Sequence, residues 1–393
     1  MFPAASLLTT LLLALSIAAS PVEIRNSPIT LPIARRLNTS GGTINLLQHD
    51  QSRAAALKNV GESTLSRRTG SITVTNDAVS YIAAVGVGSP ATTYYLIVDT
   101  GSSNTWVGAD TAYVKTSTSV DTGEAVAVDY GSGSFSGTEY TDTVTLGDGL
   151  TITAQSIGVA DRSEGFTGVD GIIGIGPLDL TEGTLTKEPD TTIPTVTDNL
   201  YSQGIISETV VGVSFEPTTS ESDANGELTS YTGDIAYTPL TTTYPASYYW
   251  GINESIAYGS TTILAETAGI VDTGTTLILI ASICNRATED DTTGLLRITT
   301  TQYDDLEDLN FVVGSNTYAL TPNGQIWPRA LNTYIGGSTD YIYLIVSSIG
   351  TPSGEGLDFI NGYTFLERFY SVFDTTTSQV GFATTAYTDA TTN

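Results

Sequence analysis

The 393-residue sequence predicts an all-β protein with a few short helices. Beyond about residue 69, Thr, Val, Ile and Tyr dominate and Gly recurs at short intervals, a pattern typical of strands separated by turns. The same stretch contains no heptad pattern, basic stripe or short-period repeat. An apolar content of 40% and a length sufficient for two or three domains indicate a sizeable core.

Individual elements follow from local patterns of apolar residues and turn residues. Strands are expected at residues 81–87, 94–98, 143–146 and 150–159, and helices at 196–203 and 279–287. The acidic stretch that starts at Glu221 has the opening spacing of a calcium-binding loop. Its twelfth position is Thr232 and no helical pattern flanks it, so we interpret it as an exposed acidic turn.

The net charge of −28 is divided unevenly along the chain. Residues 1–68 carry seven of the 14 bases and three of the 42 acids, which leaves +4 there and −32 in the remainder. A pI near 4.1 argues against nucleic acid as a partner, because its phosphates would be repelled. The single histidine, His49, lies in the basic front segment, so its removal would exclude Ser-His-Asp and Cys-His hydrolases.

The front segment has the organisation of a leader that is removed. Residues 7–18 form an apolar run too short to span a membrane, which predicts a signal peptide at 1–18 and secretion to the extracellular space. A polar, basic stretch follows and ends at the pair Arg67 and Arg68, which predicts a propeptide at 19–68. No second hydrophobic span or lipid signal is present, so no membrane contact is expected. Cys284 is the only cysteine, so no internal disulfide can form.

One motif occurs twice, 173 residues apart, and each copy carries an aspartate. The copies read LIVDTGSS at 96–103 and GIVDTGTT at 269–276. Burying an ionised acid at the end of a strand costs free energy unless hydrogen bonds compensate for the lost hydration. The glycine after each aspartate lets a backbone N–H approach the carboxylate, and the next hydroxyl can donate to its outer oxygen. A simple turn explains one copy, but two copies with matched flanks favour a functional pair.

These motifs resemble those of the pepsin-like aspartic proteases, among them the secreted fungal enzymes of the polyporopepsin type. The resemblance covers residues 77–383 approximately. It rests on five segments in the family's order, namely DTGSSNTWV at 99–107, YGSGS at 130–134, DGIIG at 170–174, DTGTTL at 272–277 and FING at 359–362.

The resemblance implies a bilobal fold with an active-site cleft between an N-terminal lobe, 69–240, and a C-terminal lobe, 241–393. It implies that Asp99 and Asp272 are catalytic, share one proton and activate a water without a cofactor or a metal. Gly101 and Gly274 would then approach the substrate, and Ser102 and Trp106 would support the dyad. Thr275 would contact the substrate.

The segment 130–134 resembles the family's flap, a hairpin that closes over the substrate. The resemblance implies that the Tyr130 hydroxyl bonds the indole N–H of Trp106, and that Gly131 and Ser132 offer backbone groups to an extended peptide. Ile172 would form a wall of the pocket for the residue before the cleaved bond. A surface tyrosine on an ordinary turn and a core isoleucine remain the plain alternatives for Tyr130 and Ile172.

Two positions depart from relatives and sharpen the expectations. Asn361 stands where most relatives have an apolar residue, so the packing beneath the second aspartate is expected to differ. Some fungal relatives carry Asp two residues after the flap tyrosine and accept lysine before the cut. Ser132 occupies that place here, which predicts a preference for large apolar residues around the cut.

The expected partners are protein and peptide substrates, pepstatin-type inhibitors and the chain's own propeptide, and the expected state is a monomer. The basic propeptide is expected to lie on the acidic enzyme near neutral pH, with one of its bases near the dyad, and to leave on acidification. A catalytically silent peptide- or protein-binding member of the same fold is the alternative function. An acidic structural or adhesive β-protein would explain the composition but not the paired motifs.

Overall fold

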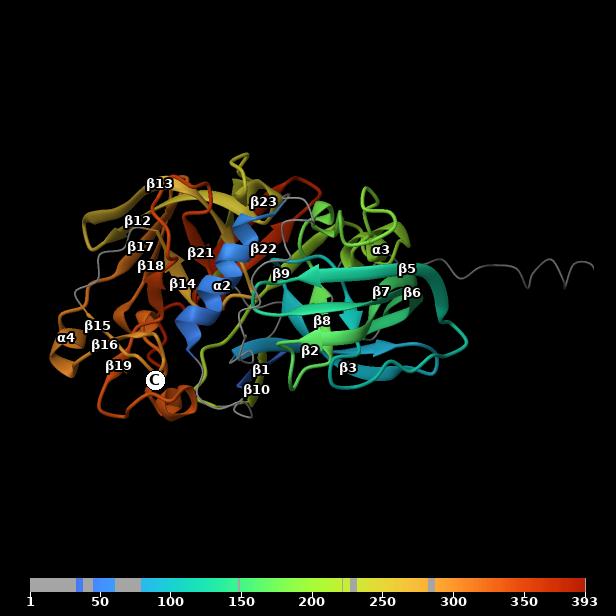
Figure 1. Ribbon diagram of the computed structural model, residues 1–393. Helices are drawn as coiled ribbons and strands as arrows, with labels where there is room; N and C mark the ends of the chain where they lie inside the picture. The colour runs from blue at the N-terminus through green and yellow to red at the C-terminus, as the bar shows by residue number, and fades with distance from the viewer. Residues whose placement is uncertain are drawn as a thin grey trace, which may run out of the picture.

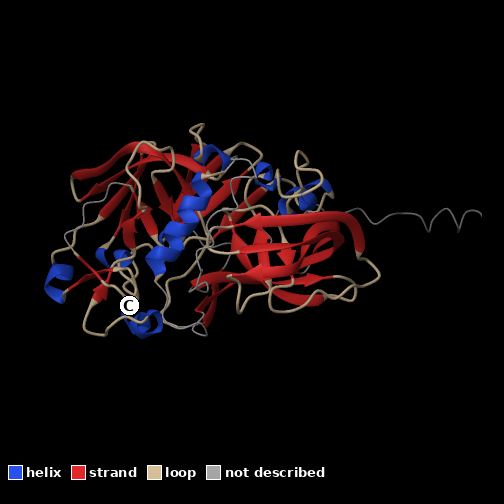
Figure 2. Cartoon of the chain, viewed as in Figure 1, coloured by secondary structure: helices blue, strands red, loops and turns tan. Residues whose placement is uncertain are grey.

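The computed structural model describes residues 33–37, 45–60, 79–147, 149–220, 222–226, 232–281 and 287–392. The expected signal peptide, the Arg67–Arg68 pair and Cys284 lie outside these ranges. Within them, strands dominate and helices are short, which confirms the expected all-β class (Figure 2).

Two sheets form the two halves of the molecule (Figure 1). The first has nine strands in the order β10-β1-β2-β3-β8-β4-β7-β6-β5. Its strands are β1 (Ile33–Leu37), β2 (Val79–Val87), β3 (Thr92–Asp99), β4 (Trp106–Val107), β5 (Val120–Asp129), β6 (Ser134–Gly147), β7 (Leu150–Glu164), β8 (Gly171–Gly174) and β10 (Ser222–Gly226).

The second sheet has seven strands in the order β18-β17-β12-β13-β21-β14-β20. These are β12 (Gly251–Tyr258), β13 (Thr261–Val271), β14 (Ile278–Ile280), β17 (Leu309–Val313), β18 (Asn316–Leu320), β20 (Val346–Ser348) and β21 (Phe359–Asn361). A small third sheet is made of β15 (Thr288–Glu289), β16 (Leu296–Ile298) and β19 (Ile342–Tyr343).

A four-stranded sheet in the order β11-β23-β22-β9 joins the halves. It contains β9 (Val210–Val213), β11 (Thr232–Pro239), β22 (Phe369–Asp374) and β23 (Gln379–Thr384). Two of these strands precede the lobe boundary expected after residue 240 and two follow it, so each lobe contributes half of this sheet.

Apart from one longer helix, the helices in the described residues are short. They are α3 (Val196–Ser202), α4 (Thr300–Asp304), α5 (Tyr363–Leu366) and the 3₁₀ turns η1 (Leu178–Thr181), η2 (Ala246–Tyr248), η3 (Pro322–Gln325) and η4 (Arg329–Ile335). No helix in the described part of the chain is long and apolar enough to cross a membrane.

The duplicated motif has a matching duplicated topology. β3 pairs in parallel with β8, which pairs antiparallel with β4. In the second sheet, β13 pairs in parallel with β21, which pairs antiparallel with β14. Each half therefore places one motif aspartate at the carboxyl end of a strand, beside a partner strand that follows much later in the chain.

The longest helix, α2 (Leu46–Lys58), belongs to the basic front segment and lies between the two halves (Figure 1). The side chain of Asn45 caps it by accepting a hydrogen bond from the amide of Gln48, 2.8 Å away. Its buried residues recur at helical spacing and so lie on one face, which includes the charged side chains of Asp50 and Arg53. These charged residues explain why the sequence shows no apolar stripe there.

Most of the expected elements are confirmed. The four expected strands lie within β2, β3, β6 and β7, and the helix expected at 196–203 is α3. The prediction of a helix at 279–287 is wrong at its start, because Ile278–Ile280 is strand β14, which lies between β20 and β21. A short, fully buried apolar run does not distinguish a central strand from a helix. Residues 282–286 lie outside the described ranges.

The prediction of an acidic turn after Glu221 is also wrong. Residues 222–226 form strand β10, which pairs with β1 of the front segment. The partner strand lies about 190 positions earlier in the chain, so no local pattern could indicate the pairing.

Candidate active site

The two motif aspartates have the same set of hydrogen bonds, one in each lobe. Asp99 accepts from the Gly101 amide at 2.9 Å and from the Ser102 hydroxyl at 2.6 Å. Asp272 accepts from the Gly274 amide at 3.0 Å and from the Thr275 hydroxyl at 2.5 Å. Both side chains are fully buried. These bonds to otherwise desolvated carboxylates are the ones that the motif predicts.

The two motif turns are bonded to each other across the lobe boundary. The Thr100 amide donates to the Thr273 hydroxyl and the Thr273 amide donates to the Thr100 hydroxyl, each at 2.9 Å. Each hydroxyl in turn donates to the strand of the other lobe, Thr273 to the Val98 carbonyl and Thr100 to the Val271 carbonyl. The threonine of each motif therefore ties the two aspartates into one unit.

Each carboxylate also lies against the glycine of the other motif. A Cβ atom added to Gly101 would lie 2.6 Å from Asp272 Oδ1, and one added to Gly274 would lie 2.5 Å from Asp99 Oδ1. Both contacts are shorter than van der Waals packing allows, so only glycine fits at either position. The glycines are thus required for the approach of the two carboxylates as well as for the turn.

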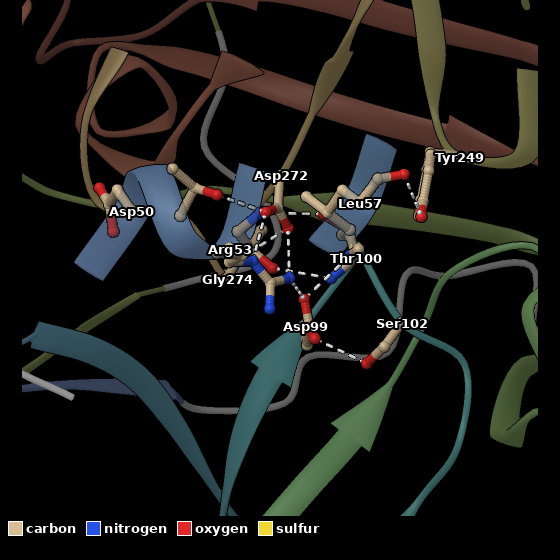
Figure 3. A network of polar contacts seen from close by, with 12 residues as sticks. Asp50, Arg53, Leu57, Asp99, Thr100, Ser102, Tyr249, Asp272 and Gly274 are labelled. Carbon is tan, nitrogen blue, oxygen red and sulfur yellow. Dashed lines mark hydrogen bonds and ion pairs between the residues drawn. The ribbon is translucent and has the colours of Figure 1, made fainter. Parts of the chain in front are cut away.

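A buried arginine, Arg53 of α2, bridges the two aspartates (Figure 3). Its Nη2 donates to Asp99 Oδ1 at 2.7 Å and to Asp272 Oδ1 at 3.1 Å, and its Nε donates to Asp272 Oδ2 at 2.8 Å. Charge-assisted bonds of this kind are the strong class of protein hydrogen bonds. The guanidinium therefore occupies the space in front of both carboxylates.

Further contacts along α2 hold the helix in place. Asp50 accepts the Leu277 amide at 2.8 Å, directly after the second motif, and is paired with His49 Nδ1 at 2.9 Å. At the other end, the Tyr249 hydroxyl donates to the Leu57 carbonyl at 3.0 Å (Figure 3). Lys58 forms an ion pair with Glu355 at 3.2 Å. The helix thus contacts the C-terminal lobe on both sides of Arg53.

The protonation of the pair depends on burial and on Arg53. Burial raises the pKa of Asp99 above its usual value, and the neighbouring Asp272 carboxylate adds to this rise although Arg53 opposes it. Burial also acts to raise the pKa of Asp272. There Arg53, Thr275 and Gly274 outweigh burial, so the pKa of Asp272 lies below its usual value. The two carboxyls therefore differ in proton affinity, as expected of a close pair.

The segment that resembles a flap is the turn between β5 and β6. Gly131, at φ +76°, packs so closely on α2 that an added Cβ would lie 2.5 Å from the Ala56 Cβ. The Tyr130 hydroxyl and the Trp106 indole nitrogen are both buried, and neither has a hydrogen-bond partner among the described residues. The Trp106 side chain lies close enough to Tyr130 to oppose the rise that burial causes in the pKa of its hydroxyl, so the expected pair is adjacent without reaching hydrogen-bond geometry. The flap rests on α2 instead, while the Trp106 ring is held by stacking on Phe135 at 4.3 Å.

The remaining expected site residues line the space next to the dyad. Ser132, Tyr130 and Ile172 share a small pocket with Asp99, Gly274 and Arg53. Trp106 lies behind this pocket, where its strand pairs with Ile172 of β8. A second cavity of about 500 Å³ includes Gly101, Ser102 and Tyr130 and is bordered by α2. In the described part of the chain, no group of His, Cys, Asp or Glu side chains could hold a metal ion.

Sequence reasoning missed the particular residues of α2 that contact the dyad and the chain next to it. It indicated a base near the aspartates but could not choose Arg53 among the seven bases of the front segment. Asp50 gave no signal, because its partner is a backbone amide more than 200 positions away. The run of two leucines after Asn45 was the one local sign that a helix begins there.

Comparisons with known proteins agree with this geometry. Residues 80–385 match the family model described as eukaryotic aspartyl protease. The chain is 64% identical over 339 residues to polyporopepsin of Irpex lacteus, covering 82% of this chain and 99% of that protein. It is 27% identical to pepsin A of Sus scrofa, covering 78% of this chain and 81% of that protein. The crystal structure of an aspartic proteinase from Irpex lacteus superposes with a TM-score of 0.79 at 56% identity, covering 93% of this chain and 99% of that one.

Proposed function

The chain belongs to the eukaryotic aspartyl protease family and is an aspartic endopeptidase with the bilobal pepsin-like fold, and we propose that it is a secreted zymogen whose dyad is Asp99 and Asp272. The observation that carries the proposal is the mirrored hydrogen bonding of the two carboxylates at the lobe boundary. The bridging of both by one arginine of the front segment supports the zymogen part.

In the proposed mechanism the dyad acts after Arg53 has left. Two close, buried carboxylates then hold one proton between them, because the second ionisation is opposed by the first. The ionised partner takes a proton from a shared water, and the protonated partner polarises the scissile carbonyl, as is established for aspartic proteases. The Gly101 and Gly274 amides and the Ser102 and Thr275 hydroxyls hold the carboxylates in position throughout.

Residues 19–68 are proposed to be the propeptide that keeps the enzyme latent. Arg53 fills the space between the two carboxylates that the proposed mechanism needs for its water, and α2 packs against the flap at Gly131. Acidification protonates the carboxylates and so weakens the ion pairs with Arg53. Activation at acid pH follows from this arrangement, and cleavage after Arg68 is proposed from the dibasic pair in the sequence alone. The leader at 1–18 is proposed to direct secretion to the extracellular space.

The substrates proposed are proteins and peptides with large apolar residues around the cut. Ile97, Phe166 and Ile172 give the pocket beside Asp99 an apolar wall. Ser132 adds no negative charge to it, so a lysine before the bond has no carboxylate partner from that position. Paired peptides with Phe or Lys before the bond test this preference, and faster cleavage after Lys would contradict it.

The test of the mechanism uses Asp99→Asn and Asp272→Asn in the full chain. Each substitution should abolish self-processing and casein cleavage, since one carboxyl alone cannot share the proton. Binding of pepstatin-type inhibitors and inhibition of the parent chain by them should accompany the activity. Activity that survives either substitution would refute the mechanism. A parent chain without pepstatin-sensitive activity after removal of residues 1–68 would favour the silent binding protein.

Arg53→Gln tests the latent state. The variant should show activity at a higher pH than the parent chain and process itself faster, because the bridge to both aspartates is lost. Lys58→Gln is the matched control, since it removes a charge from the same helix at a half-exposed pair with Glu355. Equal effects of the two substitutions would contradict a specific role for Arg53.

A further inference from the structure

The C-terminal end of α2 places a lysine against the C-terminal lobe, on one side of the dyad. The Lys58 ammonium donates to the Thr351 hydroxyl and forms an ion pair with Glu355 at 3.2 Å. Only 13% of the Lys58 side chain is exposed, whereas Glu355 remains 45% exposed. We call Thr351 and Glu355 together the Glu355 site. It holds a basic side chain of the segment that now fills the space in front of the dyad.

The Glu355 site is held in place by the C-terminal lobe and not by α2. The Asp358 carboxylate accepts from the hydroxyls of Thr267 and Ser353 at 2.6 and 2.8 Å. It also accepts from the amides of Gly354 and Glu355 at 2.7 and 3.1 Å. All of these residues lie beyond position 266, outside the proposed propeptide at 19–68. The backbone that carries Glu355 therefore keeps its hydrogen bonds when the front segment leaves.

The Glu355 site lies beside the cavity that leads to the dyad. The turn at Gly356, with φ +82°, packs directly on the backbone of Tyr244. The Tyr244 hydroxyl donates to the Val60 carbonyl at 2.5 Å. Val60 lines the cavity of about 500 Å³ that also contains Ser102 of the first motif. A chain that extends from the dyad along this cavity therefore passes close to Glu355.

The opposite wall of the same cavity is acidic. Four exposed acids of the N-terminal lobe line it, namely Asp129, Asp179, Glu182 and Asp190. Arg53 is the only Lys or Arg among the described residues that line the cavity, and it belongs to the proposed propeptide. Once α2 has left, a bound chain meets carboxylates on both sides of this end of the cleft. Such a field favours a basic chain over an acidic one.

The position of Lys58 on α2 sets the distance from the reacting bond. Lys58 follows Arg53, the residue in front of the dyad, by five positions. Five residues of helix span about 7.5 Å along its axis, at 1.5 Å each. An extended peptide covers that distance in two or three residues, at roughly 3.3 Å each. A substrate lysine at that separation from the cut therefore reaches the Glu355 site.

We propose that the Glu355 site is a specificity-determining subsite of the processed enzyme, which selects a basic residue two or three positions from the cut on one side only. This inference rests on the proposed function and adds to it the charge of the substrate at one position. It is separate from the pocket beside Asp99, whose apolar wall favours a large apolar residue at the cut itself. Preferred substrates are thus apolar at the bond and basic a short way along the chain. Lys58 is the occupant that the chain itself provides.

The experiment measures kcat/KM at pH 5.5 for quenched fluorogenic peptides with Phe on both sides of the cut. The enzyme is the full chain after acid activation and removal of the front segment. At each of the second, third and fourth positions on either side, the peptides carry Lys, Gln or Glu in turn. The enzyme variants are Glu355→Gln and Glu355→Lys. Glu289→Gln is the matched control, because Glu289 is an exposed glutamate of β15 that does not line the cavity.

The Lys peptide should be cleaved about three- to fivefold faster than the Gln peptide at the second or third position on one side, as a partly exposed ion pair allows. The difference should lie in KM, because Glu355 touches no reacting atom. Glu355→Gln should bring the Lys-to-Gln ratio close to one, and Glu289→Gln should leave it unchanged. Glu355→Lys should reverse the order, so that the Glu peptide is cleaved faster than the Lys peptide. A variant that merely loses structure cannot produce this reversal.

Three results would overturn the proposal: equal cleavage of Lys and Gln peptides at every position, a preference for Lys that persists in Glu355→Lys, or equal effects of Glu355→Gln and Glu289→Gln. In each of these cases the peptides are still cleaved, so the proposed protease function stands. Failure of the proposed function has a different signature, because pepstatin-sensitive cleavage would then be absent for every peptide, including the Gln reference. That result would remove this inference together with the function on which it rests.

Discussion

Glu254 provides a quantitative prediction about stability and pH. It lies on β12, fully buried, and both its oxygens accept from Asn361 Nδ2 at 3.2 and 3.0 Å. Burial raises its pKa from 4.5 to about 8, although the Asn361 bond opposes the rise. Asn361 Oδ1 is buried without a partner among the described residues. A protonated Glu254 could donate to that oxygen if the amide turned over. The geometry therefore suits the neutral acid.

The substitution is Glu254→Gln, which keeps the shape of the side chain and removes its titratable carboxyl. Between pH 4.5 and about 8 the unfolded chain loses this proton and the folded chain keeps it. The contribution of Glu254 is thus complete below pH 4.5 and is lost as the pH rises towards 8. The loss is about 1.4 kcal/mol per pH unit, or on the order of 5 kcal/mol over the window. That is a large part of a typical folding free energy.

The assay is thermal unfolding between pH 4.5 and 8 in an Asp99→Asn background, which prevents self-digestion. The parent should lose stability steadily across this range, and Glu254→Gln should lose markedly less. Glu266→Gln on the exposed face of β13 is the control, because it removes an exposed carboxyl. A variant whose stability falls with pH as steeply as that of the parent would refute the reasoning, as would a parent more stable at pH 8 than at pH 4.5.

Two further predictions concern the dyad and its support. Thr275→Val removes a hydroxyl that lowers the pKa of Asp272, so the acid limb of the kcat/KM profile of the processed enzyme should move to higher pH. Thr292→Val at the surface is the control, and an acid limb that stays in place in Thr275→Val would contradict the prediction. Thr273→Val breaks the bonds to the Thr100 amide and the Val98 carbonyl, and should lower stability by about 1–3 kcal/mol in denaturant unfolding. Exposed Thr262→Val should leave stability nearly unchanged, and an equally small effect of Thr273→Val would count against the cross-lobe bonding.

The repeat around the aspartates could be predicted because its physics is local. Asp99 and Asp272 each end an apolar strand and find their hydrogen-bond donors two and three residues later. The two motifs are separated by about the length of one domain, which predicts that each lobe carries one of them and that they meet between the lobes. The reciprocal threonine bonds were not anticipated, because either threonine alone reads as an ordinary turn residue.

The failures share one cause, which is a partner far away in the sequence. Ile278–Ile280 is a strand because β20 and β21 flank it, and residues 222–226 form a strand because β1 lies beside them. Arg35 and Arg53 look alike in the sequence, as two of seven bases in a polar leader. Arg53 faces two aspartates and Arg35 lies over the rings of Trp327 and Tyr363, and only the folded chain distinguishes them.

The reciprocal bonds between Thr100 and Thr273 also constrain motion. They join the two motif turns, directly beside both aspartates, where the two lobes meet. Any rocking of one lobe against the other must turn about this point, since stretching it would break buried hydrogen bonds on both sides. The rims of the cleft can then widen to admit a chain or release α2 while the two carboxylates keep their separation. The threonines therefore act as a pivot that uncouples the width of the cleft from the geometry of the chemistry.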